Sequence, residues 1–565
     1  MAASGRENYE VQVMKQGRWV TESARDKEAE ARQLAEKFLS NKACEGARVV
    51  RNWLNRDGSM SENVIFEKVQ DARGEGPIRI DPIGKAPPRC EKPRDFFGLE
   101  SRMAMNRVFR TYFEKVVLTP TELLHNRKEM QRIMDKDALV PSAVDKVATL
   151  QVKDTEMPAK QRREEIFAAL DQIQAQARRA DGFQLPKLGE RFSDTLADVA
   201  GYRDETPEYL AMVVLSRELI GTRSWLGKLE RLCKLAANEP NPQAVLLLDT
   251  VIADVLGANV AQEIMGWQRS LADAIIAMLD LADGKFDAAK SEAKDITEQL
   301  NALLAAGRLP GSQYVLIDRA LKQLRSPQPL YTNEPGKEME EYQKVLMRLL
   351  VPGGILAGEK AAEALTVRGA RFVEQGGATG RRMAITNTVQ ALPDRAHGVM
   401  YLAELSKTDF AKDHLDDIRE QLDTVFGARV IGELCRRSLS PKERMVSVTG
   451  AFKAAKNSAL PDELKEKVAA HIDGVLERYI IDEKIIEKLD HPETHLRDRA
   501  VRLVKFCGAG VLPEGKALAR ARKRVVELLR QPNFDATLVD DIPDPARKAK
   551  ALRDFHQLLV KAGFA

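Results

Sequence analysis

The sequence predicts a mainly α-helical protein in which a small N-terminal ββαββ (α+β) module is followed by an extended, solenoid-like body of α-helical repeats. Three observations support this fold class. Aromatic residues make up only 5% of the 565 residues, and the 44% in the hydrophobic class are mostly alanine and aliphatic residues, which favours helices over a large β fold. Strand-like alternation is found in the first 70 residues, and prolines recur at near-constant spacing towards the C-terminus.

Residues 1–70 carry the β signals. Tyr9, Val11 and Val13 alternate with polar or flexible residues, and Gln16-Gly17 permits a tight turn into a second strand. A helix is expected next, because apolar residues recur at the spacing of one buried face: Ala31, Leu34, Ala35 and Phe38. A second hairpin is predicted over residues 47–69, turning at Asp57-Gly58.

Two tryptophans of this module, Trp19 and Trp53, have two interpretations. They are most simply core residues of a small sheet. If the sheet leaves one face open, they instead line a surface for a partner or ligand.

Proline content divides the rest of the chain. Residues 71–98 hold five of the 25 prolines and are predicted to be a semi-extended linker. From residue 99 the helical period replaces strand signals, which predicts a helical domain over 99–325. The Pro-containing stretch 326–337 is predicted to be a second linker, and 338–565 a helical-repeat domain.

The repeat prediction rests on proline spacing. Four prolines, each expected near the first position of a helix, lie 48, 51 and 53 residues apart: Pro393, Pro441, Pro492 and Pro545. Similar connectors, residues 458–461 and 510–513, follow two of the helices. A period near 50 without strands indicates two or three stacked helices per unit.

In period and helicity, residues 390–565 resemble HEAT and armadillo repeats. That resemblance implies a stacked helical array that offers a long surface to a protein partner.

A glycine-rich stretch is a candidate anion site. Its residues are Gly376, Gly377, Gly380, Arg381 and Arg382. Backbone N–H groups at a helix start, together with two arginines, can bind a phosphate or carboxylate. The alternative is a helix end, a flexible turn and a new helix with solvated arginines.

A basic helix face is expected over residues 515–530. It consists of Lys516, Arg520, Lys523, Arg524 and Arg530. Such a face can contact nucleic-acid phosphates. Because Glu527 lies within it and no aromatic residue interleaves it, a solvated amphipathic face is the favoured interpretation.

Cysteine and histidine patterns predict neither disulfides nor a metal site. The five cysteines are far apart and lack a C-x-x-C spacing. His491 and His495 lie four residues apart, but the pattern is better explained by a helix start in which Asp490 precedes the helix. With no signal-peptide pattern and no apolar run of 18 residues, a cytoplasmic protein without a membrane span is expected.

The predicted function follows from the architecture. We expect a non-enzymatic protein that binds one or more protein partners as a scaffold or adaptor and uses no cofactor. Two alternatives remain open: nucleic-acid binding through the basic face, and an anion-sensing regulator at residues 376–382.

Overall fold

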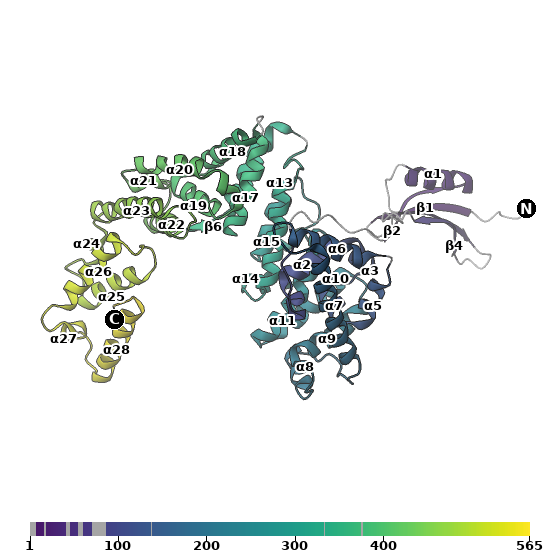
Figure 1. Cartoon of the computed structure of the whole chain (residues 1–565), viewed down its shortest axis with the longest axis horizontal. Coiled ribbons are helices and arrows are strands. Elements are labelled where there is room, and N and C mark those ends of the chain that lie inside the picture. Colours follow the sequence, from purple (N-terminus) through teal and green to yellow (C-terminus); the bar gives the residue numbers. More distant parts are fainter. Residues whose placement is uncertain are drawn as a thin grey trace, which may run out of the picture. The chain divides into compact units, whose positions relative to one another are not determined.

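The computed structural model describes residues 7–15, 18–40, 46–54, 60–69, 86–136, 138–332, 334–373 and 377–564. The chain divides into two compact units, Met1–Ile80 and Asp81–Ala565. The first contains a small antiparallel sheet with one helix and the second is a helical body, so the predicted mainly α fold class is confirmed (Figure 1).

The first unit has the predicted ββαββ order. Its elements are β1 (Glu7–Lys15), β2 (Arg18–Arg25), α1 (Glu28–Ser40), β3 (Gly46–Leu54) and β4 (Met60–Val69). All neighbouring strands pair antiparallel, in the order β2-β1-β3-β4. The predicted turns at Gln16-Gly17 and Asp57-Gly58 lie outside the described residues.

Helix α1 packs on one face of this sheet (Figure 1). Ala31, Ala35 and Leu39 form a buried cluster with alternate residues of the two central strands, namely Tyr9, Val11, Val13, Ala47 and Val49. Alternate residues of the strands and one face of α1 therefore pack together in one small core.

The second unit is built almost entirely from helices. Its elements up to residue 325 are η1 (Pro93–Phe97), α2 (Leu99–Val108), α3 (Arg110–Val116), α4 (Pro120–His125), α5 (Arg127–Met134), α6 (Leu139–Val152), α7 (Ala159–Asp181), α8 (Phe192–Val199), α9 (Pro207–Ile220), α10 (Trp225–Asn238), α11 (Pro242–Gly257), α12 (Val260–Met265), α13 (Leu271–Ala282), η2 (Ala288–Lys290), α14 (Lys294–Ala305) and α15 (Pro310–Arg325).

After residue 325 come η3 (Pro335–Lys337), α16 (Glu338–Leu349), β5 (Leu350–Val351), β6 (Gly354–Ile355), α17 (Gly358–Gly369), η4 (Ala370–Phe372), α18 (Gly377–Ala391), α19 (Arg395–Leu405), η5 (Asp409–Asp413), α20 (Leu415–Asp423), η6 (Thr424–Gly427), α21 (Ile431–Leu434), α22 (Pro441–Lys456), α23 (Asp462–Asp482), α24 (Ile485–Leu489), α25 (Leu496–Gly508), α26 (Lys516–Leu529), α27 (Phe534–Leu538) and α28 (Pro545–Lys561). Among the helices that the structure describes, none is both long enough and apolar enough to cross a bilayer.

The described part of the stretch 71–98, residues 86–98, is bonded to the second unit. Gln151 donates from Nε2 to the carbonyl oxygens of Pro87 and Pro88, at 3.1 and 2.8 Å. Arg162 donates from Nη2 to the carbonyl oxygen of Cys90 at 2.8 Å. These residues therefore belong structurally to the helical body.

Helices on both sides of the stretch 326–337 pack together. A single cluster of buried apolar side chains extends in sequence from Ala180 to Ala562. Helix α13 packs on α15 and α16, and α15 packs on α17. The stretch itself is held by Arg368 of α17, which donates to the carbonyl oxygens of Leu324, Ser326 and Gln328 at 2.7–3.0 Å.

The expectation that strand signals disappear after residue 99 is wrong at one place. Residues 350–355 form the two-stranded hairpin β5–β6, whose turn contains Gly353 with a φ of 75°. This turn packs on Gly450 of α22, where an added Cβ would lie 2.3 Å from the Gly353 carbonyl oxygen. Strands of two residues are too short to show a period of two in the sequence.

The proline-led helix starts are right at two of the four positions. Pro441 and Pro545 occupy the first turn of α22 and α28, after the caps Ser440 and Asp544. Pro393 instead precedes the cap of α19, Asp394.

The predicted helix start around Pro492 is wrong. Helix α25 begins only at Leu496, with His495 as its cap. Asp490, the expected cap, is buried and bonds the guanidinium groups of Arg499 and Arg524, at 2.7 and 2.6 Å. Its carboxylate is therefore engaged elsewhere, and residues 491–494 form a turn.

Candidate functional sites

The predicted anion site lies at the start of α18. Gly377 is the first residue of that helix, Gly380 is buried in its first turn, and Gly376 lies outside the described residues. Arg381 is exposed. Arg382 is 2.6 Å from Glu420 Oε2 and 3.4 Å from Asp417 Oδ1, both on α20. Because these carboxylates engage Arg382, anion binding here remains a prediction that depends on Arg381 and the helix start.

The predicted basic face lies on α26 and its C-cap, Arg530. The opposite side of the helix is buried, as an amphipathic helix requires. Arg524 bonds Asp490 and Glu527, and Arg520 Nη1 lies 3.8 Å from Glu477 Oε1. The three other basic residues are exposed: Lys516, Lys523 and Arg530. Nucleic-acid binding through this face remains a prediction, with its charge reduced by the protein's own carboxylates.

Trp19 and Trp53 lie on opposite faces of the sheet. Trp19 of β2 pairs with Met14, whose neighbour Val13 points towards α1, so Trp19 lies on the face away from that helix. Trp53 of β3 is four residues after Val49, so it lies on the same face of the sheet. Val49 packs against α1 on that face. Arg48 covers the Trp19 ring, with its guanidinium carbon 4.5 Å from the ring centroid. The two rings therefore do not share a surface, and a partner surface at either one remains a prediction.

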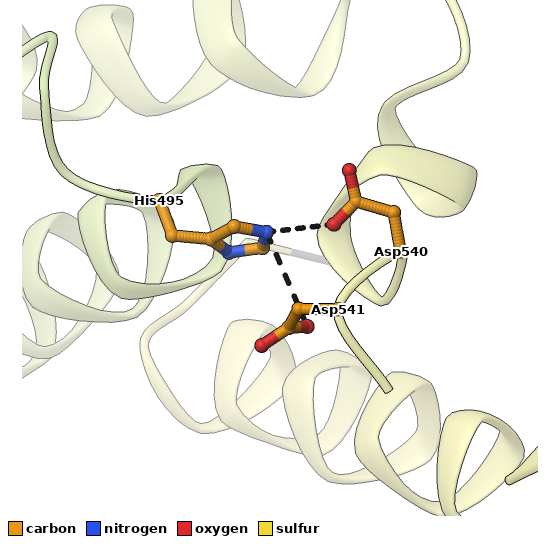
Figure 2. A group of neighbouring side chains, drawn as sticks. All are labelled: His495, Asp540 and Asp541. Atoms are coloured by element: carbon orange, nitrogen blue, oxygen red, sulfur yellow. Dashed lines mark hydrogen bonds and ion pairs between the residues drawn. The ribbon is translucent and has the colours of Figure 1, made fainter. Parts of the chain in front are cut away.

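The structure brings His495, Asp540 and Asp541 together as a group with the residue types of a metal site (Figure 2). His495 Nδ1 accepts a hydrogen bond from the backbone N–H of Arg497 at 3.2 Å. Its Nε2 donates to Asp540 Oδ1 at 2.7 Å, and Arg497 forms a two-pronged ion pair with Asp541. Both imidazole nitrogens and the Asp541 carboxylate are thus engaged. The group ties the start of α25 to the connection between α27 and α28.

A pocket of about 560 Å³ lies where η1, α4, α9 and α11 meet. Three rings on its wall lie within about 6 Å of one another, those of Phe97, His125 and Tyr209. Behind them, Arg102 and Asp254 form an ion pair at 3.0 Å, although each side chain is 5% exposed or less. The buried hydroxyl of Tyr209 has no hydrogen-bond partner among the residues that the structure describes.

Two titratable groups of this pocket, His125 and Tyr209, are neutral at pH 7. His125 donates from Nδ1 to the carbonyl oxygen of Thr121 at 2.7 Å, and burial lowers its pKa to about 4. Its Nε2 therefore carries a lone pair and acts as an acceptor. Burial raises the pKa of Tyr209, so this hydroxyl remains a donor. The pocket thus combines a hydroxyl donor and an imidazole acceptor between aromatic rings.

His125 makes the stability of the protein depend on pH. Its folded-state pKa of about 4 is below the unfolded value of 6.5, so the unfolded chain binds more protons between these values. The contribution of the neutral, buried imidazole to the free energy of unfolding is complete above pH 6.5. It is lost as the pH falls towards 4, and the loss amounts to about 3 kcal/mol in total. In His125→Gln, the free energy of unfolding measured with urea should decrease correspondingly less between pH 6.5 and pH 4. His556→Gln, at an exposed site, is the control and should follow the unmodified chain.

Trp267 is the most exposed large hydrophobic residue among those described, at 85% of its surface. It lies in the short turn between α12 and α13, directly after Gly266, whose φ is 65°. Gln268 donates from Nε2 to the Met265 carbonyl oxygen at 2.7 Å, and Ser270 caps α13. The turn is therefore held on both sides while the indole ring projects into solvent. Local sequence patterns do not single out this residue, because only the preceding glycine between two apolar helices indicates a turn.

Comparisons of the chain with protein-family models, with curated proteins and with solved structures find no match.

Proposed function

We propose that this protein is a non-enzymatic scaffold or adaptor whose helical body binds a protein partner. The observation that carries the proposal is the exposed indole of Trp267. Tryptophan is enriched among the few residues that supply most of the binding energy in protein interfaces. A tryptophan held in a short, hydrogen-bonded turn also loses little conformational freedom on binding, which favours affinity.

We also propose that the protein works in the cytoplasm. Cys90, Cys233, Cys435 and Cys507 are buried free thiols. Such thiols suit a reducing compartment, where disulfides are rare.

The docking role is tested at Trp267 itself. A photoreactive benzoylphenylalanine at position 267 should cross-link one defined protein in cells, whereas the same group at Leu246 should not. Leu246 is the matched control because it is 50% exposed but lies near the start of α11. With the purified partner, Trp267→Ala should weaken binding about 30-fold, equivalent to about 2 kcal/mol. Leu246→Ala should bind like the unmodified chain.

Two results would contradict the proposal. One is a partner that cross-links equally at 267 and 246. The other is a partner whose affinity for the Trp267→Ala variant equals its affinity for the unmodified chain.

A further inference from the structure

An apolar cavity of about 120 Å³ lies among the helices between residues 99 and 181. Its wall is made by α2, α4, α5, α6 and α7, together with the segment 86–92. Side chains from each of these five helices line it, including Met105, Leu123, Ile133, Val144 and Ile166. Protein interiors are normally packed without voids of this size, and a cavity lowers stability in proportion to its volume.

Most polar groups on the wall are engaged with one another. Arg162 is 1% exposed and donates to Gln151 Oε1 at 2.8 Å, to Glu165 Oε2 at 2.9 Å and to the Cys90 carbonyl oxygen at 2.8 Å. The thiol of Cys90 and the hydroxyl of Ser101 lie 3.1 Å apart in a hydrogen bond. A buried water needs two to four polar partners, and this wall offers few. The cavity is therefore suited to an apolar occupant.

We propose that this cavity binds a small uncharged apolar ligand, a single hydrocarbon ring or a short alkyl chain. The volume of the cavity determines the size of the ligand. An engineered dry cavity of about 150 Å³, lined by aliphatic and aromatic side chains, binds benzene or xenon. The lining sets the charge, because an ion brought here would lose its hydration and find no free partner. This ligand site is separate from the protein-docking role proposed for Trp267.

The segment 86–92 provides the route of entry. It contributes Pro87, Pro88 and Cys90 to the wall and contains no helix or strand. Side-chain hydrogen bonds from Gln151 and Arg162 attach it to α6 and α7. Local opening of such a segment requires less free energy than unfolding a helix. A small ligand can therefore exchange while the surrounding helices stay folded.

The test uses benzene and the full chain. Benzene should raise the Tm of the unmodified protein and shift the methyl resonances of Met105 and Ile133, which line the cavity. Ala143→Leu places three more carbons at a buried lining position and should abolish both responses. Ser142→Leu introduces the same side chain at the exposed neighbouring position on α6 and should keep both responses.

Either of two outcomes overturns the proposal: no shift at Met105 and Ile133 in benzene-saturated buffer, or shifts of equal size in Ala143→Leu. If Ala143→Leu does not fold, xenon decides the question. Xenon under pressure should appear in crystals of the unmodified chain between Met105 and Ile133. Crystals with no xenon at this position would overturn the proposal.

Discussion

Replacing Lys228 by methionine is expected to lower the free energy of unfolding by about 3–5 kcal/mol, because it leaves a buried carboxylate without its counter-charge. Lys228 of α10 and Glu122 of α4 are both 0% exposed. The ammonium nitrogen lies 2.5 and 2.8 Å from the two carboxylate oxygens and donates to the Val117 carbonyl oxygen at 2.6 Å. Glu122 also accepts a hydrogen bond from the backbone N–H of Thr119, which closes the capping box of α4.

A matched control lies on the same helix. Lys234 pairs with Glu230 at 2.6 Å, but both side chains are about half exposed. Lys234→Met should therefore change the free energy of unfolding by about 0.5 kcal/mol or less. Urea denaturation of both variants gives the comparison, and Lys228→Met combined with Glu122→Leu should recover part of the loss. An equal change in the free energy of unfolding for the Lys228 and Lys234 variants would show that the buried ion pair is no more important for stability than the exposed one.

Arg368→Met is expected to have a similarly large effect, about 3–5 kcal/mol, since it leaves the buried carbonyl group of Leu324 and the part-buried carbonyl groups of Ser326 and Gln328 without a donor. Arg368 is 1% exposed, and its guanidinium group donates to four backbone carbonyl oxygens at the end of α15 and in the segment after it, those of Gln323, Leu324, Ser326 and Gln328. The last carbonyl groups of a helix have no donor within the helix. The planar guanidinium group of Arg368 supplies N–H donors to them.

This effect has a local signature. Amide hydrogen exchange of Ser326, Gln328, Leu330 and Tyr331 should become faster in Arg368→Met, because this side chain attaches the segment to α17. Arg368→Lys should not restore the protection, because a single ammonium group cannot reach four carbonyl groups in different directions. Arg371→Met, at an exposed arginine that donates to the Arg325 carbonyl oxygen at 3.3 Å, is the control. Unchanged exchange in Arg368→Met would contradict this role.

The local part of the fold could be predicted from the sequence. The ββαββ order of the first unit followed from alternation at Tyr9, Val11 and Val13 and from one apolar helix face, because these periods depend on neighbouring residues alone. Pro441 was predicted correctly for the same reason: the capping box between Ser440 and Glu443 is complete within four residues. The helix predicted to start at Pro492 failed because Asp490 is bonded to Arg524, 34 residues away.

Candidate sites were harder to predict than helices. The sequence placed Arg382 in an anion site, but the carboxylates of α20 lie beside it only in the folded chain. It offered Trp19 and Trp53 either as core residues or as a partner surface, and only strand pairing shows that they lie on opposite faces of the sheet. Neither Trp267 nor the apolar cavity could be found from local patterns, because exposure and unfilled volume are properties of packing.

By itself, the sequence determined the fold class, the order of elements in the first unit and single helix starts such as that at Pro441, because these depend on hydrophobic period and on caps a few residues away. Only the tertiary structure decided which charges are buried together and which surfaces remain exposed. Lys228 forms an ion pair with Glu122, which is 106 positions away in the sequence. The indole of Trp267, between α12 and α13, is exposed to solvent. The physical reason is that burial and ion pairing depend on distances between side chains in space, and no local pattern contains those distances.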